Sequence, residues 1–461
     1  MEDFHTFELS ELDQIMPRLY IRWLLCIPFS QASPSKAAII NSLQGGIKTT
    51  VEKLPFLLGV VVSKSSDPSR LEIHLPRERH NFELRVQNHD SDHDETLPTY
   101  ESLEKAEFPA SSLPDNMLTP PDIDPRPAFD MMATFIRGGL LLCIKCHHAA
   151  ADGGGLGLIV KFLAQNCYAH PAQTTLGPTS LPSIDRSNLP RERDLWVLAD
   201  TGFNFVNPVD ATQKPTKDYA SMTSHTFKFG PESLRMLKSL CITGSERIST
   251  QDALTALLYG SVSHARGLRN TKTSTTTTAL PSVMGIAVNG RGRLNPPVAN
   301  YAGNCTLYAT FSNPIVLPVE KITDHSFEHL NLLSQHLNLP SLASKTRASI
   351  NAVTHDSIVS TISAAASLEE VSRFQPSFAD FLQGADFFIT SGADFPVFEQ
   401  EWWAGGMVDA LRIPFKGNWD GSCAVLATKD RSKGLDIMLG LRDDDMALVK
   451  EILLAFGAHI V

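Results

Sequence analysis

Apolar residues follow two different spacings along this chain, and the difference separates expected strands from expected helices. Residues 139–146 form a short, mostly apolar run, which is typical of a strand buried on both faces. Directly after it, apolar residues recur at helical spacing, namely Leu156, Ile159, Phe162, Leu163 and Cys167. The pattern therefore predicts a strand, a turn and a helix over residues 139–167.

Other segments alternate apolar and polar residues, and they include residues 71–75 and 82–86. Such alternation is typical of strands with one buried face. Residues 226–229 have the same pattern, and Pro231, a favourable first residue for a helix, follows them. Strands and helices therefore alternate along the chain, which predicts an α/β protein with mixed sheets.

Two further helices are expected in the second half. Ser249 and Asp252 resemble a capping box, which predicts that a helix starts there. Near the C-terminus, the aspartates at 443–445 suit the positive end of a helix. The apolar stripe of this last helix consists of Leu448, Val449, Ile452, Leu453 and Phe456. The stripe predicts a core-facing helix.

The composition changes between residues 169 and 190, where prolines stand among Ser, Thr and Gly. This mixture resists regular structure. We therefore expect residues 1–190 to form one domain, residues 191–225 to cross over, and residues 226–461 to form a second domain. Domains of this size bury a sizeable core.

The charge balance limits the partners, because 50 acidic residues outnumber 40 Lys and Arg and give a net charge of -10. Phosphate backbones and anionic lipids repel an acidic protein, so we expect neither a nucleic acid nor a membrane as partner. The seven cysteines are odd in number, and the first residues lack the pattern of a secretory signal. We expect a cytoplasmic monomer with reduced cysteines.

The candidate chemistry is concentrated in residues 146–153, Cys-His-His-Ala-Ala-Ala-Asp-Gly. Imidazole, with an ordinary pKa of about 6.5, is well suited to remove a proton from an alcohol near neutral pH. The segment lies between the predicted strand and helix, where Gly153 lets the backbone bend and approach a ligand. The plain alternative is a pair of histidines that are satisfied polar groups at a strand end.

Other motifs overlap this segment. Cys143, Cys146 and His147 match the spacing of haem attachment, and the two cysteines also match redox and zinc motifs. Residues three apart in a strand point to opposite faces, however, so these sulfurs are badly placed to bind one metal or haem. Gly155 and Gly157 lack the third glycine of a dinucleotide fingerprint. We therefore predict no metal site and no permanently bound cofactor.

The sequence His-His-Ala-Ala-Ala-Asp-Gly resembles the HHxxxDG signature of BAHD acyltransferases, chloramphenicol acetyltransferase and peptide-synthetase condensation domains. Residues 288–304 are similar to the mid-chain block of BAHD proteins, and smaller matches lie at residues 9–13, 54–59 and 249–254. The chain most resembles fungal trichothecene 3-O-acetyltransferase-like members. The resemblance implies the two-domain chloramphenicol acetyltransferase-like fold, in which each domain is a mixed β-sheet with flanking helices and the active site lies at the interface.

The resemblance also implies roles for individual residues. His148, the histidine that fits HxxxD, is expected to be the general base. The family's aspartate points away from the cleft and pairs with an arginine, which implies that Asp152, Gly153 and Arg291 support the site structurally. Residue spacing alone leaves a second role open, in which Asp152 orients His148 as in a catalytic triad.

The candidates for a substrate or CoA pocket are His147, Ser391, Trp403, Gly405 and Trp419. By order along the chain, the family loop usually written DFGWG falls on residues 401–405, where only Gly405 keeps its identity. In the family this loop supports the protein around the CoA tunnel, so the departure leaves the acyl donor open. The tryptophans have a second interpretation as core residues.

The resulting hypothesis is an enzyme that transfers an acyl group, acetyl above all, to a hydroxyl of a small specialised metabolite. Acyl-CoA is the expected co-substrate, and the acceptor would attack its thioester directly in a ternary complex. Two alternatives stay open. One is condensation-type transfer from a carrier protein, and the other is a degenerate member that binds a metabolite without acylating it.

Overall fold

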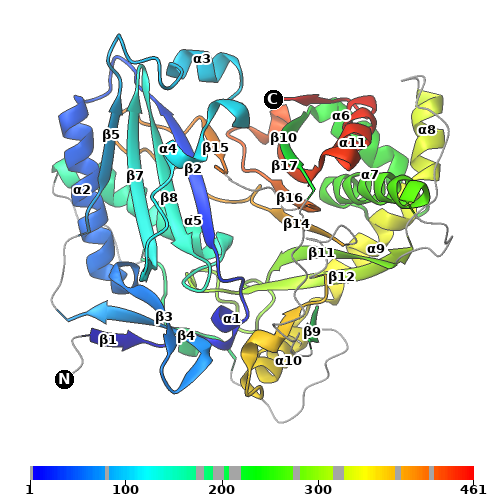
Figure 1. Cartoon of the computed structure of the whole chain (residues 1–461), viewed down its shortest axis with the longest axis horizontal. Helices are drawn as coiled ribbons and strands as arrows, with labels where there is room; N and C mark the ends of the chain where they lie inside the picture. The colour runs from blue at the N-terminus through cyan, green and yellow to red at the C-terminus, as the bar shows by residue number, and fades with distance from the viewer. Residues whose placement is uncertain are drawn as a thin grey trace.

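The chain folds into two halves that lie side by side, as Figure 1 shows for a computed structural model. The structure describes residues 4–77, 82–172, 181–190, 202–206, 220–273, 281–314, 327–378, 386–414 and 420–461. Each half is built around a mixed sheet with helices packed on it. The expected fold class is therefore present.

The first half contains a five-stranded sheet in the order β15-β2-β8-β7-β5 and a smaller sheet in the order β1-β4-β3-β6. Its strands are β1 (Phe4–Phe7), β2 (Tyr20–Pro28), β3 (Val60–Lys64), β4 (Asp67–Pro76), β5 (Arg85–His89), β6 (Arg126–Pro127), β7 (Phe129–Ile136) and β8 (Gly139–His147). Its helices are α1 (Glu11–Gln14), α2 (Lys36–Lys53), α3 (Tyr100–Lys105), α4 (Asp115–Leu118) and α5 (Gly153–Ala169).

The predicted central strand, β8, is buried along its whole length. Because successive side chains of a strand point to opposite faces, Leu140, Leu142 and Ile144 join one core with α2 and α5. Leu141 and Cys143 join a second core with residues of α3 and α4. Because both faces of β8 pack against a core, its sequence is a continuous apolar run and does not alternate between apolar and polar residues.

The second half contains a seven-stranded sheet in the order β12-β11-β14-β16-β17-β10-β18. Its strands are β10 (Met222–Phe229), β11 (Pro281–Asn289), β12 (Thr306–Pro314), β14 (Phe387–Ser391), β16 (Ser422–Val425), β17 (Leu435–Arg442) and β18 (Ala458–Ile460). Its helices are α6 (Pro231–Cys241), α7 (Thr250–Thr273), α8 (Phe327–His336), α9 (Leu339–Ala352), α10 (His355–Ala366) and α11 (Asp443–Ala455). A pair formed by β9 (Phe203–Phe205) and β13 (Phe374–Pro376) lies outside this sheet.

Short strand β15 (Ala410–Arg412) links the halves, because it comes late in the sequence but pairs with β2 of the first half. The five-stranded sheet therefore ends in a strand from the second half of the chain. The predicted crossover, residues 191–225, lies mostly outside the described residues, and the domain boundaries stay a prediction.

Most predicted elements are found where the spacing places them. Ser249 and Asp252 form both hydrogen bonds of a capping box at the start of α7. The strand predicted at residues 82–86 is displaced, because β5 covers Arg85–His89 and its extent is set by parallel pairing with β7. Among the residues described, we find no helix with the length and apolar character that a membrane span requires.

Candidate active site

His148 lies directly after β8, and its backbone N–H donates to the carbonyl of Leu19 at 2.8 Å. Four residues later, Asp152 is the N-cap of α5 and accepts a 2.7 Å hydrogen bond from Gly155 N–H. The two side chains are therefore held at the end of a buried strand and at the start of a helix, as the sequence pattern predicts.

The glycines after Asp152 do not act as a flexible turn, because Gly153, Gly154 and Gly155 already belong to the first turn of α5. Glycine is required here because other segments pack closely against the start of α5. A Cβ on Gly155 would collide with the carbonyl oxygen of Ala302, and one on Gly154 would lie 2.8 Å from Arg291 Nη1. The absence of side chains lets the segment around residue 302 approach the helix start closely.

A cavity of about 160 Å³ lies beside His148, between the five-stranded and the seven-stranded sheet. Its lining is mostly apolar and comprises Ile21, Trp23, His148, Asp152, Gly153, Ala287, Thr306, Tyr308, Phe388, Thr390, Gly392, Phe395, Leu411, Ile413 and residues 424–427. Thr306 and Tyr308 are two apart in β12, and Phe388 and Thr390 are two apart in β14. One face of the seven-stranded sheet therefore forms a cavity wall.

Asn304 fixes the state of the His148 ring. Asn304 Nδ2 donates to Asp13 Oδ1 at 2.8 Å and to the carbonyl of His148 at 2.8 Å. These two bonds leave Asn304 Oδ1 as the atom that faces His148 Nδ1, at 3.2 Å. A carbonyl oxygen only accepts, so Nδ1 carries the proton and Nε2 keeps its lone pair.

Burial lowers the pKa of His148 below its ordinary value, although Asp152 and Asn304 act in the opposite direction. A lowered pKa keeps the imidazole neutral at neutral pH. Neutral imidazole with a free Nε2 is the state that a general base needs.

Asp13 is itself held in place from several sides. It accepts hydrogen bonds from the backbone N–H groups of Ser10 at 2.8 Å and Asn304 at 3.0 Å. Arg186 Nε donates to its second oxygen at 3.1 Å. Neither Asp13 nor Asn304 was singled out from the sequence. Both lie inside blocks that carry the resemblance, residues 9–13 and 288–304, and this was the signal that pointed to them.

Asp152 is occupied by Arg291 in a bidentate ion pair with distances of 2.7 and 3.1 Å. It also accepts from the N–H of Cys305 at 2.7 Å and from the Thr306 hydroxyl at 2.9 Å. Burial alone would raise the pKa of Asp152, but the Arg291 charge and the hydrogen bonds outweigh it and hold the pKa below its usual value. In the described part of the chain, no hydrogen bond joins Asp152 to the His148 ring.

His147 lies outside the cavity lining and packs edge-on against Tyr20, with ring centroids 5.2 Å apart. Its Nδ1 accepts from the N–H of Ala149 at 3.2 Å. Burial, with the charges of His148, Arg126 and other neighbours, lowers the pKa of His147 to about 3. His147 is therefore a neutral, packed residue beside the site.

None of the remaining pocket candidates that the structure describes belongs to the lining of the His148 cavity. Trp403 is 2% exposed, packs in the core of the first half and is not among the residues that line the cavity, which favours the core interpretation. Gly405 has a φ of +76° and stands near Ser30 and Ala32 rather than in the cavity lining. Ser391 is exposed at the end of β14, and Trp419 lies outside the described residues.

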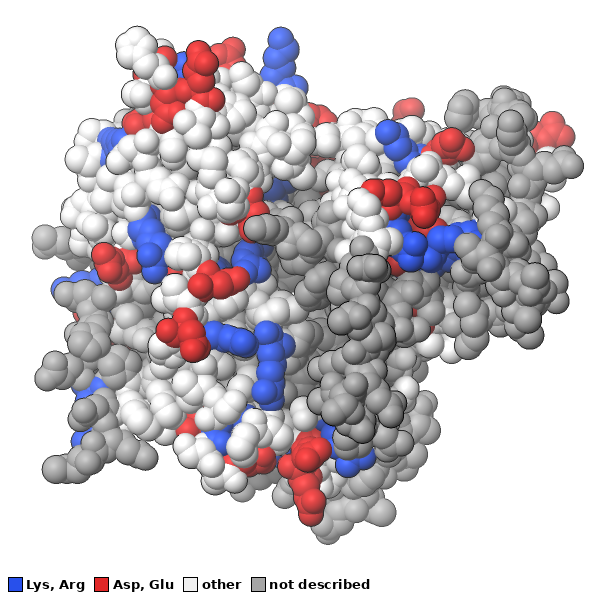
Figure 2. All heavy atoms as spheres, in the orientation of Figure 1, with Lys and Arg blue, Asp and Glu red and all other residues white. Residues whose placement is uncertain are grey.

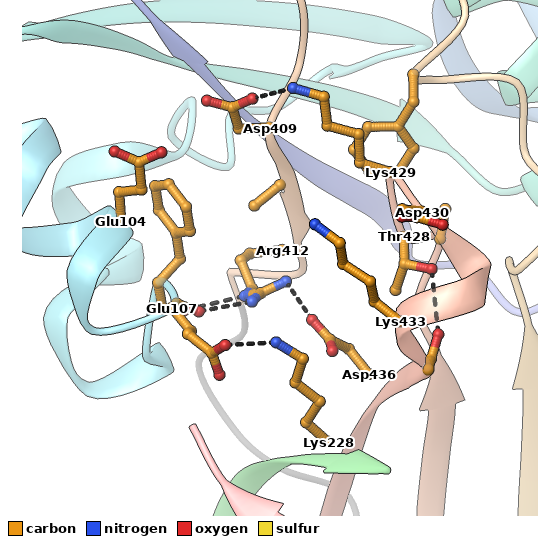
Figure 3. A pocket seen from close by; sticks show the side chains of 15 residues that line it. Glu104, Glu107, Lys228, Asp409, Arg412, Thr428, Lys429, Asp430, Lys433 and Asp436 are labelled. Carbon is orange, nitrogen blue, oxygen red and sulfur yellow. Dashed lines mark hydrogen bonds and ion pairs between the residues drawn. The ribbon is translucent and has the colours of Figure 1, made fainter. Parts of the chain in front are cut away.

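A second cavity of about 380 Å³ adjoins the first and shares Ala427 with it. Figure 3 shows that many charged side chains line it and that most of these charges are paired. Lys228 pairs with Glu107, Arg412 with Asp436 at 3.1 Å, and Lys429 with Asp409 at 2.5 Å.

Lys433 extends into this second cavity (Figure 3). It helps to lower the pKa of Asp430, after stronger effects of hydrogen bonds from Ser432. Within the described ranges, however, the Lys433 ammonium forms no ion pair. An unpaired cation in a polar cavity is suited to an anionic group of a ligand.

The described residues on the face drawn in Figure 2 form no large patch of a single charge sign. On the face drawn in Figure 2, acidic and basic side chains are interspersed. Among the residues that the structure covers, no group of three or more His, Cys, Asp or Glu is arranged to hold a metal ion.

Comparison with known proteins gives the family. Residues 19–167 match the family described as the trichothecene 3-O-acetyltransferase-like N-terminal domain. The eremophilane O-acetyltransferase ORF8 of Penicillium roqueforti is 24% identical over 459 residues, which cover 92% of each chain. The chain is therefore similar to trichothecene 3-O-acetyltransferase-like proteins over residues 19–167 and, at lower identity, to a fungal O-acetyltransferase over nearly its whole length. The predicted resemblance is confirmed.

Solved structures agree with this trichothecene 3-O-acetyltransferase-like assignment at the level of the fold. The trichothecene 3-O-acetyltransferase TRI101 of Fusarium sporotrichioides, in complex with coenzyme A and T-2, superposes with a TM-score of 0.79 at 21% identity and covers 97% of both chains. Vinorine synthase superposes with a TM-score of 0.65 at 15% identity, over 99% of this chain and 94% of its own. The predicted chloramphenicol acetyltransferase-like fold is confirmed.

Proposed function

We propose that this protein transfers an acyl group from acyl-CoA to a hydroxyl of a small specialised metabolite, and that the group is acetyl. The observation that carries the proposal is the His148 ring, whose Nδ1 is held by Asn304 at 3.2 Å beside a cavity between the two sheets. The names of relatives support it, since they include an eremophilane O-acetyltransferase and a fumigaclavine B O-acetyltransferase.

His148 is the general base in this proposal. Its Nε2 removes the proton of the acceptor hydroxyl while the acceptor oxygen attacks the thioester carbonyl carbon. The carbon–sulfur bond then breaks, and the imidazolium returns the proton to the leaving thiolate. Such a base contributes about 100- to 10,000-fold in rate.

Asp152 and Arg291 hold the site together in this proposal without touching the substrates. Their bidentate pair joins the start of α5 to the segment that precedes β12. The same segment supplies Asn304, so the ion pair also supports the residue that orients His148.

The second cavity is the proposed entrance for the donor. Coenzyme A carries phosphates, and Lys433 supplies an unpaired ammonium in this cavity, which adjoins the catalytic one at Ala427. The smaller, mostly apolar cavity then receives the acyl group and the acceptor skeleton.

A donor panel tests the proposal. The protein is incubated with hydroxylated terpenoid and alkaloid acceptors and with acetyl-CoA, longer acyl-CoA thioesters, acetyl-N-acetylcysteamine or an acetyl-loaded carrier domain, and products are followed by mass. We expect a gain of one acetyl group with acetyl-CoA and a much weaker reaction with the truncated donor, which lacks the phosphates. Transfer only from the carrier domain would favour condensation-type chemistry, and no gain with any donor would favour a binding protein.

We also propose that the enzyme acts as a monomer in the cytoplasm. All seven cysteines are buried and unpaired, which suits a reducing compartment. One chain supplies residues to the cavity from both halves, so the site needs no second copy. Light scattering should give a mass near 50.5 kDa, and twice that mass would contradict the monomer.

A further inference from the structure

Tyr308, like His148, lines the catalytic cavity, and its side chain carries a hydroxyl group. It lies in β12, two residues after Thr306, so both side chains point to the cavity face of the sheet. Thr306 donates its hydroxyl to Asp152. In the described residues, the Tyr308 hydroxyl has no such hydrogen-bond partner, although the residue is only 6% exposed.

The Tyr308 ring is held firmly by other aromatic rings. Phe378 and Phe388 meet it edge-on, with centroids 4.9 and 5.8 Å away, and Phe203 lies 5.2 Å away. These contacts come from β9, β14 and the residues after β13. A ring fixed from three sides directs its hydroxyl with little loss of entropy on reaction.

The phenol remains protonated during turnover. Burial, and to a lesser extent the Asp152 charge, raises the pKa of Tyr308 above its ordinary value. A phenol in this state donates a hydrogen bond but does not compete with His148 as a base. The surrounding wall also contains Phe388 and Phe395, whose side chains offer no hydrogen-bond donor to a developing negative charge.

We propose that Tyr308 donates a hydrogen bond to the thioester carbonyl oxygen in the transition state, an inference that rests on the proposed function. As the acceptor oxygen bonds to the carbonyl carbon, the π electrons of the carbonyl move onto the carbonyl oxygen, and the proton of the acceptor hydroxyl moves to His148. When the oxyanion re-forms the carbonyl, the carbon–sulfur bond breaks and the thiolate takes the proton from His148. Tyr308 keeps its own proton throughout.

Tyr168 provides the matched control, because it is 50% exposed on α5 and is not among the residues that line the cavity. The experiment measures kcat and KM for acetyl transfer by the wild-type protein, Tyr308→Phe and Tyr168→Phe, together with thermal unfolding of each. Tyr308→Phe keeps the ring and its contacts, so its fold should persist. We expect its kcat to fall about 100-fold or more with little change in KM, and Tyr168→Phe to stay within about twofold of wild type.

If the wild type is active and Tyr308→Phe has the same kcat, the role of Tyr308 is overturned and the proposed function still stands. An equal loss in Tyr168→Phe would mean that the fall is not specific to the cavity hydroxyl, and it would overturn the role. A rise in KM alone for Tyr308→Phe would mean that the hydroxyl binds substrate without stabilising the oxyanion, which also overturns the role. A wild type inactive with every donor would overturn the proposed function and this role with it.

Discussion

Asn304 accepts a hydrogen bond from His148 Nδ1 at 3.2 Å while donating to the carbonyl oxygen of the same residue at 2.8 Å. The amide therefore holds His148 through hydrogen bonds to both its ring and its backbone. Since Asp13 occupies the other available contact of Nδ2, the amide cannot turn over without losing two good bonds. One neutral tautomer of His148 follows from this arrangement.

Asn304→Ala should lower kcat about 10- to 1,000-fold, because the ring loses the group that fixes its tautomer and orientation. Steady-state kinetics of acetyl transfer check this. Asn300→Ala is the matched control, since the Asn300 side chain donates to the carbonyl of Leu181 in an exposed segment. Equal rates for Asn304→Ala and Asn300→Ala would contradict the assignment.

Asp152→Asn should destabilise the fold by about 3–5 kcal/mol, because it breaks a buried ion pair and leaves Arg291 without its carboxylate. Denaturant unfolding measures the change. Asp394→Asn is the control, since Asp394 pairs with Arg431 at an exposed position, where about 1 kcal/mol or less is expected. A fully stable but inactive Asp152→Asn would instead favour the triad role.

Gly155→Ala should cost about 1–3 kcal/mol of stability, although alanine usually favours a helix over glycine. The added Cβ collides with the backbone of Ala302, which has no flexible side chain to move aside. Gly292→Ala is the control, because a Cβ at Gly292 meets no atom within 4 Å. A thermal midpoint for Gly155→Ala at or above that of the control would show that the close packing is not limiting.

The His147 pKa of about 3 makes stability depend on pH. Between about pH 3 and about pH 6.5 the unfolded chain binds a proton at this histidine and the folded chain does not, so acidification favours unfolding. The contribution is at most about 1.4 kcal/mol per pH unit. His147→Gln removes it, so the stability difference between wild type and variant should shrink as the pH falls. A difference that stays constant from about pH 6 to about pH 4 would contradict this.

The sequence was most informative where local spacing decides structure. The strand at residues 139–146 and the helix after Asp152 follow from periodicity, and the Ser249 capping box from spacing of three residues. The pairing of Asp152 with Arg291 came from the family resemblance rather than from spacing, since 139 residues separate them.

The rest of the site depends on contacts between distant segments. Asp13 and Asn304 are 291 residues apart, and no local sequence pattern indicates that they form a hydrogen bond. Trp403 carries the residue type of a pocket but packs in the core, because side-chain chemistry does not reveal which face of a segment is buried. Strand β15 joins the opposite half for a similar reason, as its partner β2 lies far back in the sequence.

The rate of acetyl transfer by His148→Ala, measured across pH beside folded wild type, is the sharpest test of His148 as the general base. We expect a loss of about 100- to 10,000-fold in kcat, and for wild type an acid limb that lies below the ordinary histidine pKa of about 6.5. The limb lies there because burial lowers the pKa of His148. A folded His148→Ala variant that transfers acetyl within about twofold of wild type would contradict the role of His148 as the general base.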